Sequence, residues 1–403
     1  MAYQIGKGLC PKPGKCRVFP PLRFSSFHTA EGKVRIDRIE IIRAAMPLVT
    51  PFRTACGDDA VNETVLVGLW SDGVCGWGEG ASGGAPTYAP ECAATQFIVS
   101  RDFIAPHLAG EDIASGEDLH ERLAHIRGNR FAKGAFDLAW WDLHARIEGE
   151  PLWNLLGGRR RTVDAGADFG IQDTIDELLD KVTGAVEGGY RRVKLKCRPG
   201  WDIDMIRAVR EAFPHTTIHV DCNSSYTLED IEIFEEMDRH NLAMIEQPLA
   251  HDDLIDHAVL QERITTPICL DESVNSPDKA RKAVMIGACR WINIKPGRVG
   301  GITPSLAIHD ICRDAGIGCW IGGMLESAVG AMHCLALATL PNILYPSDIF
   351  PSERFFAKDL GRPSMKHSGP SQFAVPETPG AGAEPDPEVL EELTVERIEV
   401  TAS

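Results

Sequence analysis

"RRVKLKC" spans residues 191–197 and places two lysines in a run that otherwise has the apolar character of a buried strand. Lysine is among the residues least often fully buried in proteins. Side chains two positions apart lie on the same side of a strand, so Lys194 and Lys196 should point to one inner surface. The pattern therefore indicates a polar site in the interior of the fold.

Short apolar segments of this kind recur from about residue 162 onward. They are TVDAGADFG (162–170), RRVKLKC (191–197), TIHVDCN (217–223), LAMIEQP (242–248), PICLDES (267–273), WINIKPG (291–297), GCWIGGM (318–324) and NILYPSD (342–348). Amphipathic helical segments such as DMIRAVREAF (204–213) lie between them. Eight strand–helix units predict an α/β fold of the (β/α)8 TIM-barrel type. A doubly wound sheet is the alternative, but the Gly-rich phosphate loop expected after its first strand is missing.

The chain before this region has a different pattern. "KVRIDRIEIIRAAMPL" (33–48) and "ETVLVGLWSDGVCGWGEG" (63–80) alternate as antiparallel strands do, and helical periodicity follows from about 91 to 155. We therefore expect an α+β domain over residues 33–158 and the barrel over 159–370. Residues 371–403 should return along the surface, with "LTVERIEV" (393–400) as a last strand.

Composition excludes several classes of function. The formal net charge of -17 and the pI near 5.2 argue against nucleic acid or an anionic membrane as a partner. No apolar run is long enough to span a membrane. The 12 cysteines are scattered without a CxxC pair, which is typical of reduced thiols in a cytoplasmic protein. Residues 1–32 are basic and rich in proline, and we expect a disordered extension, with a targeting segment as the alternative.

Three successive strands end in a carboxylate. Asp221, Glu246 and Asp271 follow one another at intervals of 25 residues, which is about the length of one strand–helix unit. They should therefore lie on adjacent strands at the carboxyl end of the barrel, where this fold holds its active site. Three converging anions repel one another unless a cation joins them, and oxygen ligands suit Mg²⁺. Ordinary strand-end ion pairs are the alternative for these acids.

A further lysine, Lys295, ends the sixth strand and should face Lys196 across the metal, because strands two and six lie opposite each other in an eight-stranded barrel. A carboxylate substrate between them would present the proton α to its carboxylate to a lysine base. We expect Lys194 to lower the pKa of Lys196 as a neighbouring positive charge. The metal would stabilise the resulting enediolate. Asn223 shares a face with Asp221 and should orient a ligand or contact substrate.

At these residues the chain resembles the enolase superfamily, in its muconate-lactonizing-enzyme subgroup. The Lys-x-Lys on the second strand and the lone lysine on the sixth mark that subgroup. Within it, "PGWD" (199–202), "CLDES" (269–273), "KPGRVGG" (295–301) and "GGMLES" (322–327) look like the o-succinylbenzoate synthase and N-succinylamino acid racemase family. "MPLVTPFRTACG" (46–57) looks like the loop with which that family's capping domain closes over substrate.

The resemblance implies a role for each of these residues. Asp221, Glu246 and Asp271 match the Mg²⁺ ligands, Lys196 the base, Lys194 its neighbour and Lys295 the facing lysine, and Mn²⁺ can replace Mg²⁺. Gly323, Met324 and Glu326 fall in the motif that should contact substrate, and Glu326 could instead pair with a basic residue. Arg298 could influence Lys295, reach an acidic substrate tail or form a structural salt bridge.

Asp168 departs from the family pattern, because relatives tend to have a small or hydroxyl side chain there. An acid at the end of the first strand would repel the succinyl carboxylate of a family substrate. Three interpretations remain open: Asp168 pairs with a cation such as Arg298, it faces away from the site, or the substrate carries a positive group.

The motifs predict a Mg²⁺-dependent enzyme that acts on a small carboxylate substrate. The leading hypothesis is an o-succinylbenzoate synthase, a hydro-lyase of menaquinone biosynthesis. A racemase of N-succinylamino or N-acylamino acids is the alternative, because the same constellation serves both reactions. More distant alternatives are a muconate-type cycloisomerase and a barrel that binds metal and carboxylate without turnover. We expect a cytoplasmic homo-oligomer with no nucleic-acid or membrane partner.

Overall fold

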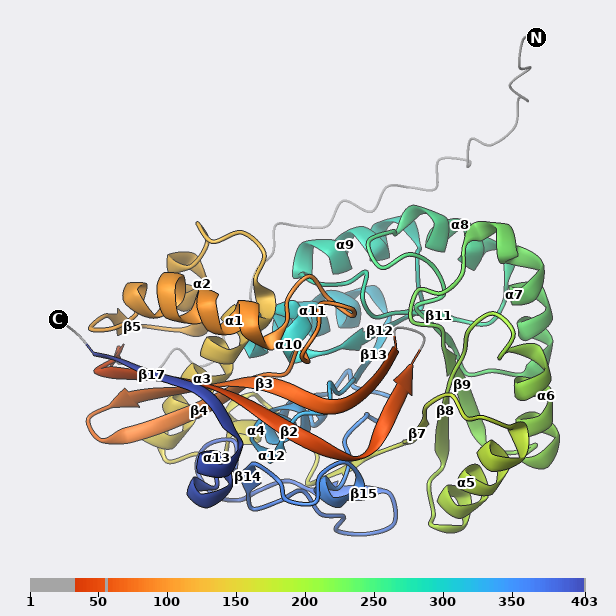
Figure 1. Ribbon diagram of the computed structural model, residues 1–403. Coiled ribbons are helices and arrows are strands. Elements are labelled where there is room, and N and C mark those ends of the chain that lie inside the picture. The colour runs from red at the N-terminus through yellow and green to blue at the C-terminus, as the bar shows by residue number, and fades with distance from the viewer. Residues whose placement is uncertain (1–32, 55–56, 402–403) are drawn as a thin grey trace.

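The computed structural model describes residues 33–54 and 57–401, so the predicted basic extension lies outside the described residues. The described chain forms a strand-and-helix unit beside a curled parallel sheet that is covered by helices (Figure 1). No helix within the described ranges is long and apolar enough to cross a membrane.

The N-terminal unit is built on a four-stranded antiparallel sheet in the order β17-β2-β3-β4. Its strands are β2 (Arg38–Thr54), β3 (Gly57–Ser71), β4 (Val74–Gly80) and β17 (Thr394–Thr401), and β1 (Val34–Arg35) pairs separately with β5 (Asp112–Ile113). Its helices are α1 (Ala93–Val99), α2 (Gly116–Arg122), α3 (Arg130–Glu148) and α4 (Leu152–Leu155). The predicted final strand is thus present as β17, and it joins this sheet beside β2.

Helix α3 packs unusually close to β4 because two glycines leave room for its backbone. A Cβ atom on Gly76 would lie 2.2 Å from the backbone nitrogen of Leu143, and one on Gly78 would lie 2.1 Å from the carbonyl oxygen of Ala135. Any larger residue at either position would push the helix away from the sheet. The Gly-rich end of β4 therefore fixes the depth at which α3 sits.

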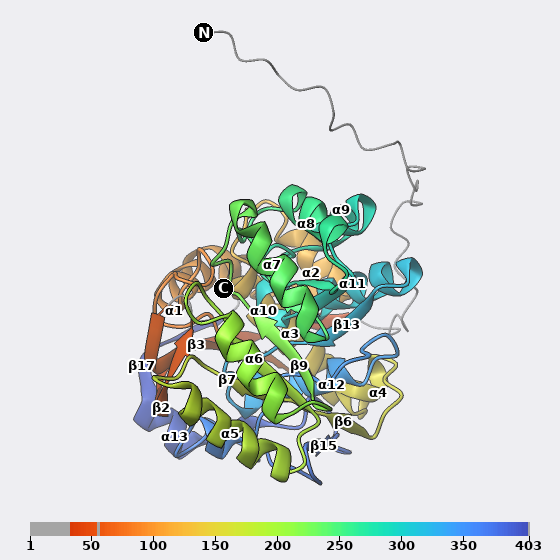
Figure 2. The same ribbon diagram turned by 90° about the vertical axis from the view of Figure 1, so that its right-hand side faces the viewer.

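The second unit is a seven-stranded parallel sheet in the order β7 to β13. Its strands are β7 (Ala167–Phe169), β8 (Arg192–Lys196), β9 (Thr217–Asp221), β10 (Ile245–Glu246), β11 (Ile268–Leu270), β12 (Trp291–Ile294) and β13 (Gly318–Ile321). The helices are α5 (Ile175–Glu187), α6 (Ile203–Ala212), α7 (Ile231–Met237), α8 (Ile255–Arg263), α9 (Pro277–Ile286), α10 (Pro296–Val299), α11 (Ile302–Ala315) and α12 (Ala328–Ala338). Figure 2 shows α5, α6 and α7 side by side on the outside of this sheet.

The predicted eighth strand, residues 342–348, differs from expectation. It makes only isolated parallel bridges, from Ile343 to Cys319 on one side and from Ser347 to Ala165 on the other. Pro346 has no N–H group to donate to a neighbouring strand, which interrupts a regular ladder. The segment still lies between β13 and the chain that leads into β7, so it closes the barrel in irregular form.

The remaining elements connect the two units. The predicted first strand divides into β6 (Thr162–Asp164), which pairs with β15 (Gln372–Ala374), and β7 of the parallel sheet. The C-terminal part also contains β14 (Gly361–Arg362), β16 (Glu384–Pro385) and α13 (Pro387–Leu393). The hairpin β2–β3 extends from the N-terminal unit toward the β7 end of the barrel (Figure 1), where the backbone N–H of Ile171 donates to the carbonyl of Arg53.

Candidate active site

Three basic side chains of β8 point to the same inner face of the barrel. Arg192, Lys194 and Lys196 alternate along the strand and are all buried. Arg192 Nη2 lies 2.6 Å from Asp348 Oδ1, and Lys194 Nζ lies 2.8 Å from the second oxygen of the same carboxylate. Asp348 thus holds the two deeper cations of the row.

The three predicted acids lie on neighbouring strands at one level. Asp221 ends β9 and stands directly beside Glu246 at the end of β10 and beside Lys196 on β8. Asp271 follows β11, which pairs with β10. All three side chains are fully buried. The regular spacing in sequence therefore corresponds to adjacency in space.

The lysines of β8 contact these acids. Lys196 Nζ lies 2.8 Å from Asp221 Oδ2 and donates to Asn223 Oδ1 at 3.0 Å. Lys194 Nζ lies 3.1 Å from Asp221 and 3.4 Å from Glu246, so its ammonium group sits between these two carboxylates.

Lys295 approaches from the opposite part of the sheet, directly after β12. Its Nζ lies 2.9 Å from Asp271 Oδ2 and 4.5 Å from the ring centre of Tyr88. The Tyr88 hydroxyl donates to Asp271 Oδ1 at 2.9 Å, and Arg298 makes an ion pair with the same oxygen. Asp271 therefore has two cations and a hydroxyl group around it.

One pocket joins the two sides of this arrangement. Its lining includes Lys194, Lys196 and Asn223 from the β8–β9 side, Lys295 from β12, and Gly323 and Met324 from the loop after β13. The N-terminal unit covers it with Phe52, Asn62 and Tyr88. Asn62 Nδ2 donates to the carbonyl of Leu325 at 2.6 Å, which ties the cover to the 322–327 loop.

Burial and ion pairing compete in setting the protonation states here. Burial alone would raise the pKa of Asp221, but Lys196 and Lys194 outweigh it and hold that pKa well below its usual range. Burial likewise opposes the charge on Lys194, yet Asp348 and Glu246 raise the pKa of this lysine well above normal. The site is a network of charged groups that neutralise one another.

The donor set suits a hard divalent cation. It consists of carboxylate oxygens, and Glu246 Oε2 accepts no hydrogen bond although it is buried. Within the described residues, however, no three His, Cys, Asp or Glu side chains converge closely enough to hold a metal ion as they stand. A cation bound by Asp221 and Glu246 would compete with the ammonium group of Lys194 that lies between them.

The structure shows which groups surround Lys194. The prediction is that this lysine lowers the pKa of Lys196 as a neighbouring positive charge. Asp348, Asp221 and Glu246 all lie within 3.4 Å of its ammonium nitrogen, and Asp168 lies 3.8 Å away. Its charge is therefore balanced locally, and its repulsion of Lys196 is weakened.

Asp168 lines the pocket and pairs with a cation, but that cation is Lys194 and not Arg298. Its nearest cation is Lys194, while one carboxylate oxygen accepts no hydrogen bond. Arg298 is directed instead to Asp271, the Tyr88 hydroxyl and the carbonyl of Val274. The interpretation that Asp168 faces away from the site is wrong as well.

Glu326 and Arg298 lie behind the pocket rather than in its lining. Glu326 accepts a hydrogen bond from the backbone N–H of Met324 at 2.8 Å, and no basic residue in the described chain forms an ion pair with it. Its burial raises its pKa. It thus supports the loop that carries Gly323 and Met324.

Sequence reasoning missed four residues of the network. Asp348 ends the irregular eighth segment, and the rule that identified the other strand-end acids could have found it. Arg192 lies two residues before Lys194, so the period of the strand was a sufficient signal. Asn293 donates to Glu246 Oε1 at 2.7 Å from within β12. Tyr88 comes from a loop of the N-terminal unit, and nothing in the local sequence pattern indicates where that loop docks.

Both units of the chain match models of known protein families. Residues 38–157 match the N-terminal domain of mandelate racemase / muconate lactonizing enzyme, and residues 177–389 match the enolase C-terminal domain-like family. The chain is 43% identical to an o-succinylbenzoate synthase of Geobacillus kaustophilus, over 90% of this chain and 96% of that protein. It is 40% identical to an N-succinylamino acid racemase of Thermus thermophilus, over 92% of this chain and all of the relative.

Two solved structures have the same fold as this chain. An enolase-superfamily protein of Listeria innocua superposes with a TM-score of 0.88 at 36% identity, and the match covers 91% of this chain and 99% of that one. The N-succinyl Arg/Lys racemase of Bacillus cereus superposes with a TM-score of 0.85 at 25% identity, over 91% of this chain and the whole of that chain.

Proposed function

The chain is an enzyme of the mandelate racemase / muconate lactonizing enzyme family in the enolase superfamily, and we propose that it acts as an o-succinylbenzoate synthase. The observation that carries the proposal is the pocket in which Lys196 and Lys295 approach one space from two sides, with the three strand-end acids behind them. The named synthases among the relatives support the choice of reaction.

The proposed reaction is the loss of water from a cyclohexadiene carboxylate to give 2-succinylbenzoate, for menaquinone biosynthesis. Lys196 would remove the proton α to the carboxylate, because its amine faces the pocket and Asn223 holds it in place. The hydroxyl group on the neighbouring carbon would then leave as water with that proton. The Lys295 ammonium would stabilise the negative charge from the opposite side.

We propose Asp221, Glu246 and Asp271 as ligands of Mg²⁺, which Mn²⁺ could replace. The bound ion would stabilise the negative charge that develops on the substrate carboxylate. Within the chain, Asn293 and Arg298 orient two of the three acids by donating to Glu246 and pairing with Asp271. Such partners behind a ligand fix its direction.

The substrate-contacting residues are proposed in two groups. Asn223, Asp168, Gly323 and Met324 line the pocket and would contact substrate directly. Glu326 and Arg298 would act indirectly, the first through Met324 and the second through Asp271. We also propose a cytoplasmic enzyme, which the free, mostly buried cysteines of the described chain support.

A racemase of N-succinylamino acids is the second candidate. The presence of a lysine on each side of the pocket favours it, because racemisation needs one base for each face of the substrate carbon. Two N-succinylamino acid racemases are 40% and 41% identical to this chain, close to the 43% of the Geobacillus kaustophilus synthase.

The test measures both reactions with the purified full chain. Formation of 2-succinylbenzoate from the cyclohexadiene substrate should proceed with a kcat/KM of at least about 10⁴ M⁻¹s⁻¹, the lower end for enzymes on their own substrates. Racemisation of N-succinylphenylalanine, followed by polarimetry, measures the alternative. No detectable dehydration together with efficient racemisation would replace the first candidate by the second.

A further inference from the structure

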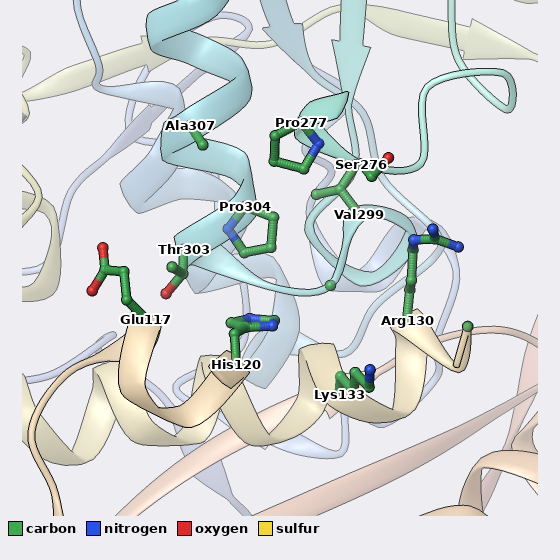
Figure 3. Close-up of a pocket in the computed structure, with 12 residues that line it drawn as sticks. Glu117, His120, Arg130, Lys133, Ser276, Pro277, Val299, Thr303, Pro304 and Ala307 are labelled. Carbon is green, nitrogen blue, oxygen red and sulfur yellow. The ribbon is translucent and has the colours of Figure 1, made fainter. Parts of the chain in front are cut away.

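A second pocket lies away from the lysines, where the N-terminal unit meets the barrel. It encloses about 380 Å³, within the range of small-molecule sites. Helices α2 and α3 form one side, and the start of α9 and the α10–α11 turn form the other (Figure 3). None of its lining residues belongs to the pocket of the catalytic lysines.

The floor of this pocket is basic. His120 projects from α2, and Arg130 and Lys133 project from α3 (Figure 3). His120 is held by Asp137 at 3.1 Å, and Lys133 Nζ donates to the carbonyl of Ile126. Within the described chain, the Arg130 guanidinium makes neither an ion pair nor a hydrogen bond, although it is partly buried and burial lowers its pKa.

Few acids balance these groups. Glu117 lines the far end of the pocket and is exposed. Glu91 is the acid that acts electrostatically on Arg130, but its carboxylate accepts the backbone N–H groups of Phe131 and Ala132. Burying a guanidinium group whose N–H donors have no partner costs free energy unless an anion binds to it. Such a group favours carboxylate, which can accept two parallel hydrogen bonds.

The opposite wall is largely apolar, with Ser276 and Thr303 as its polar residues. It is formed by Pro277 at the start of α9, Val299 at the end of α10, and Pro304 and Ala307 on α11. A small inorganic anion would leave this wall in contact with water. A ligand with a hydrocarbon body and a carboxylate would pack its body against the apolar wall and bind the basic floor with its carboxylate.

We propose that this pocket binds a small organic carboxylate with an apolar body, with Arg130 as its principal anchor. The inference is independent of the proposed reaction, because it concerns binding alone. The site adjoins the catalytic centre through α10: Val299 faces this pocket, while Lys295 and Arg298, a few residues earlier, face the acids of the barrel.

Titration calorimetry of the full chain with benzoate tests the proposal. We expect a dissociation constant on the order of 0.1–1 mM, as for a well-seated ligand of this size. Inorganic phosphate, which has charge without an apolar body, and benzyl alcohol, which has the body without charge, should each bind at least tenfold more weakly. Equal binding of either control would overturn the proposed chemistry of the ligand.

Four variants identify the pocket at which benzoate binds. Arg130→Met should weaken benzoate binding at least tenfold, whereas Arg127→Met, an exposed arginine three residues earlier, should leave it unchanged. Ala307→Phe fills the pocket from the opposite wall and should also abolish binding, which keeps the test valid if Arg130→Met does not fold. Lys196→Ala should bind benzoate as the unmodified chain does. Loss of binding in Lys196→Ala with full binding in Arg130→Met would assign benzoate to the catalytic pocket and refute the proposal.

Discussion

Replacing Asp168 by asparagine should change substrate preference in a defined direction. Asp168 lines the catalytic pocket with one oxygen free of hydrogen bonds, and its charge is offset by Lys194 at 3.8 Å. An anionic substrate tail in the same pocket would be repelled by this carboxylate. Asparagine keeps the size and polarity of the side chain but removes the charge.

The magnitude follows from the electrostatic interaction. Two unit charges about 6 Å apart at an effective dielectric constant of about 20 repel by roughly 3 kcal/mol, which corresponds to about a hundredfold change in kcat/KM. Lys194 should keep its place in the variant, because Asp348 and Asp221 still hold it at 2.8 and 3.1 Å. We therefore expect kcat/KM for N-succinyl substrates to rise by up to about a hundredfold, while N-acetyl substrates change little.

Steady-state kinetics with N-succinyl- and N-acetylphenylalanine measure this ratio. Asp176→Asn, which removes an exposed acid on α5, is the matched control and should alter neither substrate. If Asp168→Asn instead impairs the succinyl substrate alone, the acid serves to position a cation for the tail. A parallel change with both substrates would also refute the repulsion argument.

Three further predictions concern the metal, the cover of the pocket and the pH dependence of stability. Treatment with EDTA should abolish dehydration and Mg²⁺ or Mn²⁺ should restore it; full activity of the metal-free enzyme would contradict the ligand proposal. Tyr88→Phe keeps the ring beside Lys295 but loses the hydroxyl bond to Asp271, so kcat/KM should fall about 10- to 100-fold, as expected for a hydrogen bond to a charged group; less than a twofold change would exclude this role. Burial raises the pKa of Glu79 to about 7, so the folded chain holds an extra proton between about pH 4.5 and 7 and loses stability as the pH rises through that window. Glu79→Gln removes this loss. The difference in melting temperature between the variant and the unmodified chain should therefore favour the variant more at pH 8 than at pH 5, by an amount that corresponds to at most about 3 kcal/mol in the free energy of unfolding. The same difference at both pH values would refute the assignment.

Much of the candidate site could be predicted because it depends on regular strands. Asp221, Glu246 and Asp271 were identified from an equal spacing that the parallel ladder converts into neighbouring positions. Lys194 and Lys196 followed from the two-residue period of one strand. These inferences required only local periodicity and the known edge at which parallel strands end.

The remaining features depend on irregular backbone. Pro346 makes the segment before Asp348 bridge its neighbours only at isolated points, although the strand-end rule itself could have identified this acid. Tyr88 reaches Asp271 from a loop that is 183 residues away in sequence. The partner of Arg298 was left open among several interpretations, because its position on the short helix α10 decides which acid it contacts, and that acid is Asp271.

The charge balance of the site also bears on how a lysine can serve as a base here. Each inward cation of β8 and β12 has a carboxylate close by: Lys194 has Asp348, Lys196 has Asp221, and Lys295 has Asp271. Burial disfavours the charged form, yet neighbouring acidic groups raise the pKa of Lys194 and of Lys295, and a protonated lysine cannot accept a proton from the substrate. A lysine of this network becomes a base only when its partner acid is engaged elsewhere. Asp221 and Asp271, the partners of Lys196 and Lys295, are two of the three acids proposed as metal ligands, so a cation bound there would draw these carboxylates away from the two lysines.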